Sequence, residues 1–547
     1  MVGLSKYFIA IFIVFYTFHC FAIFSYKNDD ERKVFYLFQN VLIVLTHVMG
    51  FYVLCERGGG SELVILCALE EALFLGFILA YRLLYPKATR LITNNICMLM
   101  AIGFVMLARL SNARAVRQFV VAVIGMAFAL VIPWLIQKIY FIRYYYWTAG
   151  IAGIAVLLIM MTVGTVTKGS KITLTLAGVS FLPSEFVKLL FVFFVAGMLT
   201  DEEHRNKVTG RLDRPQLLAS MIIAAAHVGI LALCKDLGGA LIFFIIYMFM
   251  LYTATRMPIV LIGGSLGMVL GSVAGYEIFA HVRNRVEAWR DPFADIEGTG
   301  YQMAQSLFAI GTGSWFGLGL AAGSPKSIPE VSKDFMFAAI SEELGALTAL
   351  CIILICLSNF LMFMNISMAI GDLYLRLMAV GLAVNYGFQV ILTIGGVTKF
   401  IPLTGVTLPL VSYGGSSVLV TLMAFAIIQG LYITAHKEEE NPDEEYSEED
   451  DRYYDDRDDE DDEDDRRYYK DDEDDEDDRR YYKDDEDDVI YDEDKDRYYD
   501  DEEGYEEGYE EDDPEDERNM NNAGYRAGHS KKRSGRHLSE RPVREKR

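Results

Sequence analysis

The sequence has few cysteines, and nothing in their spacing pairs them. Seven occur in 547 residues, and each lies within or at the end of an apolar run. Cysteines in that setting read as packing residues, so the sequence predicts neither a disulfide framework nor a cysteine metal site. The first apolar run, residues 7–26, also lacks a convincing cleavage site. It is therefore predicted to be a retained span and not a signal peptide.

Long apolar runs dominate what is present. Most of them are about as long as a helix must be to cross a hydrocarbon layer of ~30 Å at ~1.5 Å per residue. We count thirteen, with soft borders near Asp236 and at the short seventh run, and predict an all-α polytopic membrane protein. The predicted spans are residues 7–26, 34–55, 62–84, 93–110, 117–138, 146–165, 184–200, 216–234, 237–253, 257–280, 335–363, 371–397 and 413–435.

The net charge of −25 is unevenly distributed along the chain. Residues 437–547 hold 52 acidic and 21 basic side chains, a net of −31, whereas residues 1–436 sum to +6. A segment with so many like charges buries too little apolar surface to offset the entropy of ordering. We therefore predict a disordered acidic tail with a basic terminus, either a solvating appendage or a docking arm.

Basic clusters in the short loops indicate the orientation. Residues 82–90, 138–143 and 204–214 each carry several cationic side chains, and counting spans places all three on one side, which the positive-inside rule makes cytoplasmic. The tail is then cytoplasmic too, and the long polar segment at about 281–334 is extracytoplasmic. Three outer arginines, Arg109, Arg114 and Arg117, count against this orientation.

Ionisable residues near the spans are the first functional candidates, because charges at membrane depth are costly and normally face a cavity or a partner. Glu185 and Lys188 follow a helix-start signal and share one helix face, as a structural ion pair or as the charged wall of a substrate cavity. Asp236 precedes glycines in a tight turn and is either a helix cap or a substrate contact. Of the adjacent Glu342 and Glu343, at least one should face the interior.

A segment rich in proline and glycine, residues 402–417, is the second candidate region. Irregular backbone at membrane depth is tolerated where it is buried in protein or lines a water-filled cavity. Backbone N–H groups near Gly414, and the start of the following helix near Ser416, would suit an anionic ligand such as pyrophosphate.

Six motifs occur in a fixed order between residues 183 and 417. They are Pro183-Ser184-Glu185-Phe186-x-Lys188, Asp236-Leu237-Gly238, Asp291-Pro292 to Gly300-Tyr301-Gln302-x-x-Gln305-Ser306, Phe308 to Gly319, Asp334 to Gly345, and Pro402 to Ser417. In this order they resemble the SEDS family of shape, elongation, division and sporulation proteins, the group of FtsW, RodA and SpoVE. The resemblance covers residues 93–435. Ten of the thirteen predicted spans lie there, which is the number in the family fold.

The resemblance implies an organisation in three parts. Residues 1–92 would form about three additional N-terminal transmembrane helices, and residues 93–436 a SEDS-like catalytic core that includes the long extracytoplasmic loop. Residues 437–547 would form the acidic tail. The protein is then expected in the bacterial cytoplasmic membrane as a multi-pass protein.

The resemblance also implies an activity, the polymerisation of peptidoglycan from lipid II beside a class B penicillin-binding protein, with no nucleic acid involved. The family's essential loop carboxylate lies five residues before the glycine of the Gly300-Tyr301-Gln302 motif, which makes it Asp295. Asp295 is then the expected general base for the attacking hydroxyl. Asp291 is the second choice. Ile296 follows Asp295 where the family usually has proline.

The departing pyrophosphate needs cationic or N–H groups near it, with or without a divalent cation such as Mg or Mn. The chain has no specific metal-ligand spacing, so no metal ligands are predicted. The expected substrate-binding residues are Glu185, Lys188, Arg285, Gln302, Gln305, Lys326, Asp334, Glu342, Ser412, Gly414 and Ser416.

Two other functions remain as alternatives to polymerisation in division, elongation or sporulation. One is a flippase or transporter for the lipid-linked sugar, and the other is a catalytically silent scaffold for the penicillin-binding protein. A flippase needs charges at mid-depth on several helices and access from both faces. A polymerase concentrates its polar groups on the outer side, as this sequence does.

Overall fold

The computed structural model describes residues 2–26, 29–138, 140–167, 170–176, 179–201 and 213–440. The predicted disordered tail lies outside these residues except for residues 437–440, which are helical, and most of the third basic cluster lies outside them too. Thirteen helices in the described part are long and apolar enough to cross a membrane, as predicted. They are α1 (Val2–Ser25), α2 (Asp29–Glu56), α3 (Ser61–Leu84), α4 (Arg90–Leu110), α5 (Asn112–Lys138), α6 (Tyr146–Val163), α7 (Pro183–Thr200), α8 (Arg214–Leu233), α9 (Leu237–Thr255), α10 (Pro258–Ile278), α13 (Met336–Ala369), α14 (Leu373–Val397) and α15 (Gly415–Glu440).

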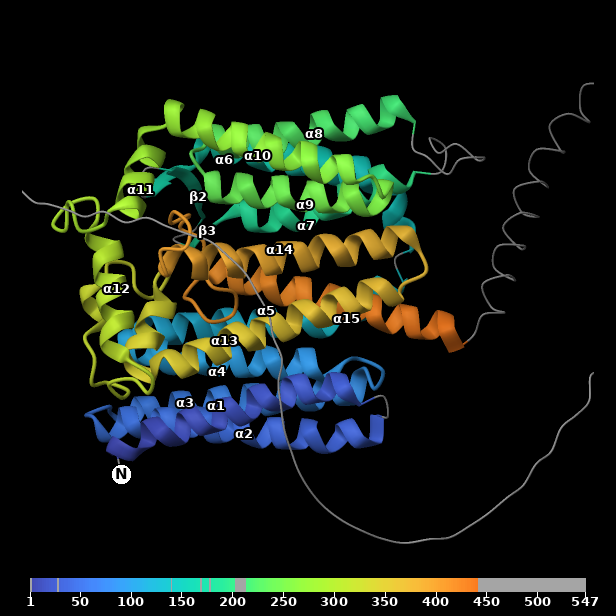
Figure 1. Cartoon of the computed structure of the whole chain (residues 1–547). Helices are drawn as coiled ribbons and strands as arrows, with labels where there is room; N and C mark the ends of the chain where they lie inside the picture. The colour runs from blue at the N-terminus through green and yellow to red at the C-terminus, as the bar shows by residue number, and fades with distance from the viewer. Residues whose placement is uncertain are drawn as a thin grey trace, which may run out of the picture. The chain divides into compact units, whose positions relative to one another are not determined.

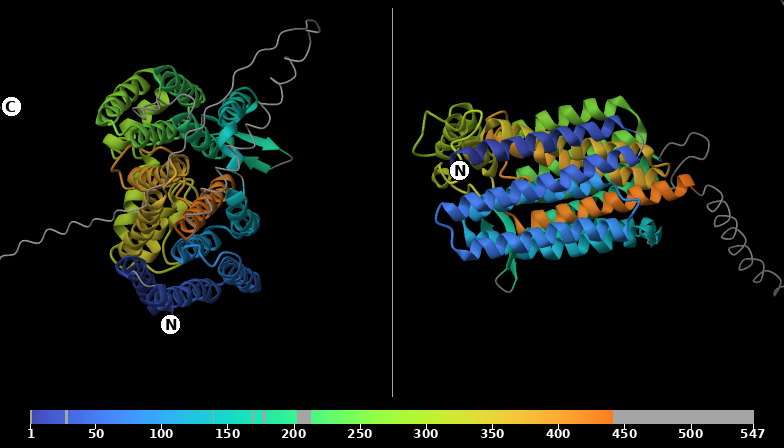
Figure 2. Two further views of the ribbon diagram at one scale, coloured as in Figure 1. Left: turned by 90° about the vertical axis from the view of Figure 1, so that its right-hand side faces the viewer. Right: turned by 90° about the horizontal axis from the view of Figure 1, so that it is seen from below.

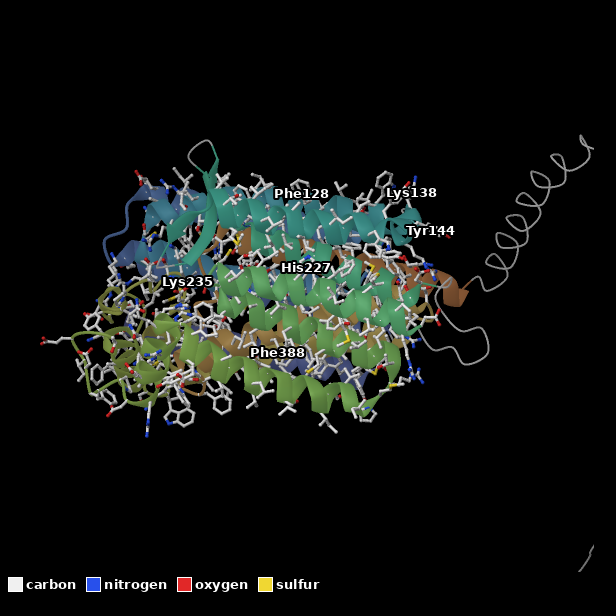
Figure 3. All side chains as sticks on the ribbon, turned by 90° about the horizontal axis from the view of Figure 1, so that it is seen from above. Phe128, Lys138, Tyr144, His227, Lys235 and Phe388 are labelled. Atoms are coloured by element: carbon white, nitrogen blue, oxygen red, sulfur yellow. The ribbon has the colours of Figure 1, made fainter. Side chains whose placement is uncertain are left out.

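The spanning helices run side by side, and the two ends of the bundle differ (Figure 1). The long polar segment lies at one end and is partly helical, because it contains α11 (Ala280–Arg290) and α12 (Tyr301–Gly313). Two 3-10 helices, η1 (Tyr140–Tyr145) and η2 (Pro325–Ser327), complete the helical elements of the described residues. Figure 3 places Lys235 at the end with the polar segment and Lys138 at the opposite end. Residues predicted to face opposite sides of a membrane therefore lie at opposite ends.

Helix burial varies widely across the bundle. α4 packs against α2, α3, α5 and α13, and nearly all of its side chains are buried. α10 packs along α9 and has no buried residue, although it is apolar on every side. A helix that is apolar all round requires an apolar environment on every face. The exposed faces of α10 are therefore suited to lipid.

The first three helices lie together on one side of the bundle, as Figure 2 shows in an end-on view. A buried polar chain joins them to the rest. The hydroxyl of Tyr16 on α1 donates to Asn95 Oδ1 on α4 at 2.8 Å, and Asn95 Nδ2 donates to Ser358 Oγ on α13 at 2.9 Å. Satisfied buried hydrogen bonds of this kind fix one arrangement of the helices.

Glu70 and Glu71 on α3 hold a histidine of α2 between them. The two ring nitrogens of His47 on α2 lie 2.8 Å from Glu70 Oε2 and 2.9 Å from Glu71 Oε1 on α3. These contacts link α2 to α3 within the N-terminal helices.

A small antiparallel sheet lies between the predicted spans 146–165 and 184–200. It consists of β1 (Thr165–Thr167), β2 (Ser170–Leu176) and β3 (Val179–Phe181), in the order β1-β2-β3. The β2 sequence alternates polar and apolar residues and is rich in threonine and β-branched side chains, a pattern typical of strands. The sheet leads directly into α7.

Candidate active site

A cavity of about 530 Å3 lies at the end of the bundle that carries the long polar segment. Its walls come from five separate stretches: the α8–α9 turn, α11, the start of α12, residues 329–334 and residues 403–405. Four of the six sequence motifs contribute to these stretches. Motifs far apart in the sequence therefore meet at one cavity, where Asp236, Arg285, Gln302 and Asp334 come together.

Asp236 both lines the cavity and begins a helix. Its Oδ1 accepts a hydrogen bond from Gly239 N at 3.0 Å, so it caps α9. Burial raises the pKa of the Asp236 carboxyl, and the charge of Glu185 adds to this, whereas the Gly239 N–H and the cations Lys188 and Arg285 oppose it. The sequence left Asp236 as either a helix cap or a substrate contact. In the structure it caps α9 and also lines the cavity, so the two roles are compatible.

Arg285 is the central cation of the cavity. Its Nη1 donates to the carbonyl oxygen of Thr404 at 3.0 Å. Burial lowers its pKa, while the charges of Asp334 and Asp236 raise it. The hydroxyl oxygen of Thr404 is buried without a hydrogen-bond partner, and Thr404 lines the same cavity. Two cations (Lys235 and Arg285), three carboxylates (Asp236, Glu330 and Asp334) and an unsatisfied hydroxyl thus line one half-open cavity.

Glu185 and Lys188 form an ion pair, one of the two alternatives for their shared helix face, with 2.9 Å between Oε2 and Nζ. Lys188 Nζ also donates to Gln389 Oε1 on α14 at 3.1 Å, and Gln389 Nε2 donates to the carbonyl of Thr407 at 3.2 Å. Lys188 is therefore engaged in a buried network that ties α7 and α14 to segment 402–417. It does not line the cavity, although its charge acts on Asp236.

Asp295 lies on an exposed turn at the edge of this region and is not itself a lining residue. Its Oδ2 accepts hydrogen bonds from the backbone N–H of Thr299 at 2.8 Å and from its hydroxyl at 3.1 Å. These bonds lower the pKa of the Asp295 carboxyl. Thr299 does line the cavity. Asp295, the predicted base, is therefore separated from the cavity by one hydrogen-bonded residue, Thr299.

The other predicted contacts on the polar segment are placed differently. Gln302 lines the cavity, Gln305 is half-buried further along α12, and Lys326 is exposed on η2. Gln305 and Lys326 are not lining residues in this arrangement.

Glu342 and Glu343 are both buried, and they hold a loop in place. Glu342 Oε1 accepts from Ser324 N at 2.8 Å, and Glu343 Oε2 accepts from Ala321 N at 3.2 Å. Glu343 also forms an ion pair with Arg109, with 3.1 Å between Oε1 and Nε. Glu342 was expected to bind substrate. In the structure its carboxylate instead accepts a hydrogen bond from the loop backbone, and it does not line the cavity.

Gly345 allows the loop to dock into the helix that carries these glutamates. Its φ of 89° breaks the helical geometry of α13. On either side of the break, Gly319 N donates to Glu343 O at 2.9 Å and Ala346 N donates to Ser314 O at 2.8 Å. The freed backbone groups of α13 are therefore satisfied by the loop, as buried backbone requires.

The predicted anion site at residues 412–416 is occupied by internal contacts. Ser412 Oγ accepts from a backbone N–H four residues earlier at 3.2 Å, and Gly414 N donates to Gln118 Oε1 at 3.3 Å. Ser416 Oγ accepts from Leu182 N at 2.9 Å. These residues join the start of α15 to α5 and α7, and none lines the cavity.

Several lining residues were not among the predicted site residues. Lys235, Asn284, Glu330 and Thr404 belong to this group. Asn284, Arg285 and Ala288 occupy one face of α11 at helical spacing, so recognising a helix in the polar segment would have identified Asn284. Thr404 carried no signal beyond its position in the Pro- and Gly-rich segment.

Within the described residues, no three or more His, Cys, Asp or Glu side chains are grouped as metal ligands. In the cavity the carboxylates Asp236 and Asp334 both act electrostatically on Arg285. A divalent cation carried in with a pyrophosphate remains a prediction.

Comparison with known proteins gives a consistent result. Residues 84–438 match the family described as cell cycle protein, FtsW, RodA and SpoVE. The peptidoglycan glycosyltransferase RodA of Mycobacterium tuberculosis is 36% identical over 371 residues, covering 64% of this chain and 79% of that protein. Stage V sporulation protein E of Bacillus subtilis is 35% identical over 285 residues, covering 50% and 74%. The helices α1 to α3 precede or only touch the matched region.

Among solved structures, one from a study of how a peptidoglycan synthase complex coordinates polymerization and crosslinking is similar to this chain. The TM-score is 0.53 at 25% identity, covering 63% of this chain and 97% of the solved one. Nearly the whole of the solved chain is thus represented here.

Proposed function

The chain belongs to the FtsW, RodA and SpoVE family, and on that premise we propose that it is a peptidoglycan glycosyltransferase that polymerises glycan strands from lipid II. The main support for this activity is the set of side chains that line the cavity. Arg285 lines a half-open cavity together with Asp236, Asp334 and the unsatisfied Thr404 hydroxyl, next to the Gly300-Tyr301-Gln302 turn. Such a space suits a sugar linked to pyrophosphate.

The proposed reaction is a single displacement at the anomeric carbon. The 4-hydroxyl oxygen of the acceptor lipid II attacks C1 of the lipid-linked glycan, and the C1–O bond to the pyrophosphate breaks. The hydroxyl proton passes to a base, and the pyrophosphate leaves with the bonding electrons. The configuration at C1 then inverts, by analogy with inverting glycosidases.

We assign the base to Asp295. In the open turn, the Thr299 hydrogen bonds and full exposure keep its pKa low, which makes it a weak base. A substrate that covers the turn excludes water, and burial raises the pKa of a carboxylate because it disfavours the charged form. Base strength would therefore increase only when the acceptor is bound.

We assign the binding of the departing pyrophosphate to Arg285 and Lys235, the two cations among the residues that line the cavity. Positively charged donors placed where negative charge develops usually contribute a large part of catalysis. Lys188 is a weaker candidate because Glu185 and Gln389 already engage its ammonium group. The Thr404 hydroxyl is available to hydrogen-bond a sugar or phosphate oxygen.

We place this cavity on the outer face of the membrane, from the positive-inside pattern of the opposite end, with lipid II as donor and acceptor. We also propose a class B penicillin-binding protein as partner. The similar solved chain comes from a complex that couples polymerization to crosslinking, which supports this pairing. A flippase is less well supported because the lining residues all come from one end of the bundle.

The test is polymerisation by the purified full chain with its transpeptidase partner and lipid II. Asp295→Ala should reduce the rate of polymer formation by about 10^2 to 10^4-fold, the contribution typical of a general base. The partner should still bind, because the turn is exposed and its substitution leaves the helical core unchanged. Wild-type polymer yields from this variant would exclude Asp295 as the base.

Glu297→Ala provides the matched control, because Glu297 is an exposed carboxylate two residues further along the same turn. It should polymerise at the wild-type rate. Wild-type chain that binds lipid II and partner without making polymer would instead support the silent scaffold. Movement of lipid II across vesicle membranes without polymer would support the flippase.

A further inference from the structure

A second cavity, of about 310 Å3, lies at the end of the bundle opposite the long polar segment. It is formed by the first part of α2, the last part of α3, the α3–α4 turn and the first part of α4. Two of these three helices end before or at the first residue of the family match. This cavity therefore exists because of the additional N-terminal helices.

The cavity is cationic. Lys33, Arg82 and Arg90 line it, and none of its lining residues, all within the described chain, is Asp or Glu. The Arg90 guanidinium carbon lies 5.9 Å from the centre of the Tyr36 ring. Each of the three cations lies within a few residues of a helix end. That is the depth at which lipid phosphate groups lie when the helices span a bilayer.

The polar floor of the cavity includes an unsatisfied group. The side-chain oxygen of Asn40 is buried and has no hydrogen-bond partner. Its neighbour Asn94 donates from Nδ2 to Gln39 Oε1 at 3.0 Å. A buried polar atom without a partner is costly and rare, so a ligand or a water that reached Asn40 from the cavity would satisfy this group. The amide of Asn40 can present either its oxygen or its NH2 group to that ligand.

The walls are rigid and aromatic. The hydroxyl of Tyr81 donates to Ala129 O at 2.8 Å, and that of Tyr85 donates to Leu130 O at 2.6 Å. Both hydroxyls are thus fixed on the backbone of α5. Tyrosine rings at this depth are typical of the membrane interface, where one side of the ring meets lipid and the other meets polar groups.

The rim of the cavity is apolar and faces outward. Val34 and Leu37 belong to the lining, yet their side chains are 55% and 64% exposed. On a spanning helix those exposed faces meet acyl chains. A ligand that bound here would therefore contact cations and amides with one part and apolar side chains with another.

We propose that this cavity binds the headgroup of an anionic phospholipid, whose phosphate lies between Arg82 and Arg90 and whose acyl chains run along Val34 and Leu37. Basic pockets between transmembrane helices on the cytoplasmic side are suited to such headgroups. The lipid joins α2 and α3 to α4 and so stabilises the attachment of the N-terminal helices to the core. This site is separate from the active-site cavity and independent of the proposed reaction.

The test is lipid binding by the purified full chain in detergent, followed by native mass spectrometry and by thermal unfolding. Phosphatidylglycerol should remain bound and should raise the unfolding temperature, and phosphatidylcholine should do neither. Arg82→Gln combined with Arg90→Gln should weaken binding by roughly tenfold or more, since each cation near an anionic lipid contributes about 1 kcal/mol. Arg82→Lys with Arg90→Lys keeps the charge and should retain most of the binding.

Lys87→Gln is the matched control, because Lys87 lies between the two arginines in sequence and does not line the cavity. It should bind phosphatidylglycerol like the wild type. Equal loss in this control, or equal binding of phosphatidylcholine, would show unspecific attraction and overturn the proposal. So would stabilisation by soluble glycerol 3-phosphate as strong as by the lipid. Failure of the full chain to bind phosphatidylglycerol, as expected if its own acidic tail filled the cavity, would overturn it too.

Discussion

The backbone N–H and the hydroxyl of Thr299 both donate to the same carboxylate oxygen of Asp295, at 2.8 and 3.1 Å. These bonds lower the pKa of Asp295 and fix the orientation of its side chain. The proposed base is therefore held charged before any substrate arrives, by a residue that itself lines the cavity.

Thr299→Val should move the pH dependence of the reaction. The substitution removes the hydroxyl donor and keeps the backbone donor, so the pKa of Asp295 rises. A base acts in its deprotonated form, so the acid limb of the kcat/KM profile should shift to higher pH. The measurement is polymerisation of lipid II across a pH series. Thr299→Ser keeps the hydroxyl and should reproduce the wild-type profile, and a shift to lower pH in the valine variant would contradict the mechanism.

Arg285→Gln should slow the chemical step. Loss of one donor to a developing anion typically costs about 10^2 to 10^3-fold in kcat. Steady-state polymerisation over a range of lipid II concentrations separates kcat from KM. Arg283→Gln is the control, since Arg283 is exposed on the same helix and donates to Glu277 O outside the cavity. An Arg285 variant altered only in KM would limit this arginine to substrate binding.

Gly345→Ala should destabilise the loop that docks on α13. At φ 89° an alanine is strained, and its Cβ would overlap the backbone of Trp315 and Gly317. A backbone conformation of this kind costs about 1–3 kcal/mol in a residue other than glycine. Thermal unfolding in detergent should show the loss. Gly311→Ala lies in a helix with open space around it, so it should leave stability unchanged or slightly raised.

Arg109→Met should be destabilising because it leaves Glu343 unpaired. The side chain of Glu343 is fully buried, whereas that of Arg109 is 18% exposed. Removing one partner of a buried ion pair typically costs about 3–5 kcal/mol. Adding Glu343→Gln removes the stranded charge and should recover most of the loss. The check is denaturant-induced unfolding of both variants. A single variant as stable as the wild type would show that the pair contributes little, and a double variant no more stable than the single one would show that the stranded charge is not the cause.

The sequence predicted the spans well because hydrophobic length alone decides them. It also placed Glu185 and Lys188 on one helix face, either as an ion pair or as a cavity wall, and in the structure they form the ion pair. The sequence could not show that the Lys188 ammonium group also donates a hydrogen bond to Gln389, because Gln389 lies 201 residues away along the chain. The helices inside the polar segment were missed as well, because α11 is mostly polar and too short for a clear apolar stripe.

Several residues expected to bind substrate instead form hydrogen bonds between segments of the fold. Serine hydroxyls, backbone N–H groups and carboxylates serve a ligand or a neighbouring segment equally well. Ser416 and Glu342 meet chain segments 234 and 18 residues away, and sequence patterns do not record such partners. Asp236, by contrast, serves a helix end and the cavity together.

The pair formed by Arg109 and Glu343 has a consequence for how the protein is made. Glu343 is synthesised 234 residues after Arg109. Gly323, whose carbonyl is the other partner of Arg109, is synthesised 214 residues after it. At roughly 5–20 residues per second, the ribosome needs roughly 10 to 50 s to reach Glu343. During that interval the nascent chain carries an arginine at the loop end of α4 without the groups that later neutralise it. Until α13 is made, Arg109 can be solvated only by water at the membrane interface or by parts of the chain already present.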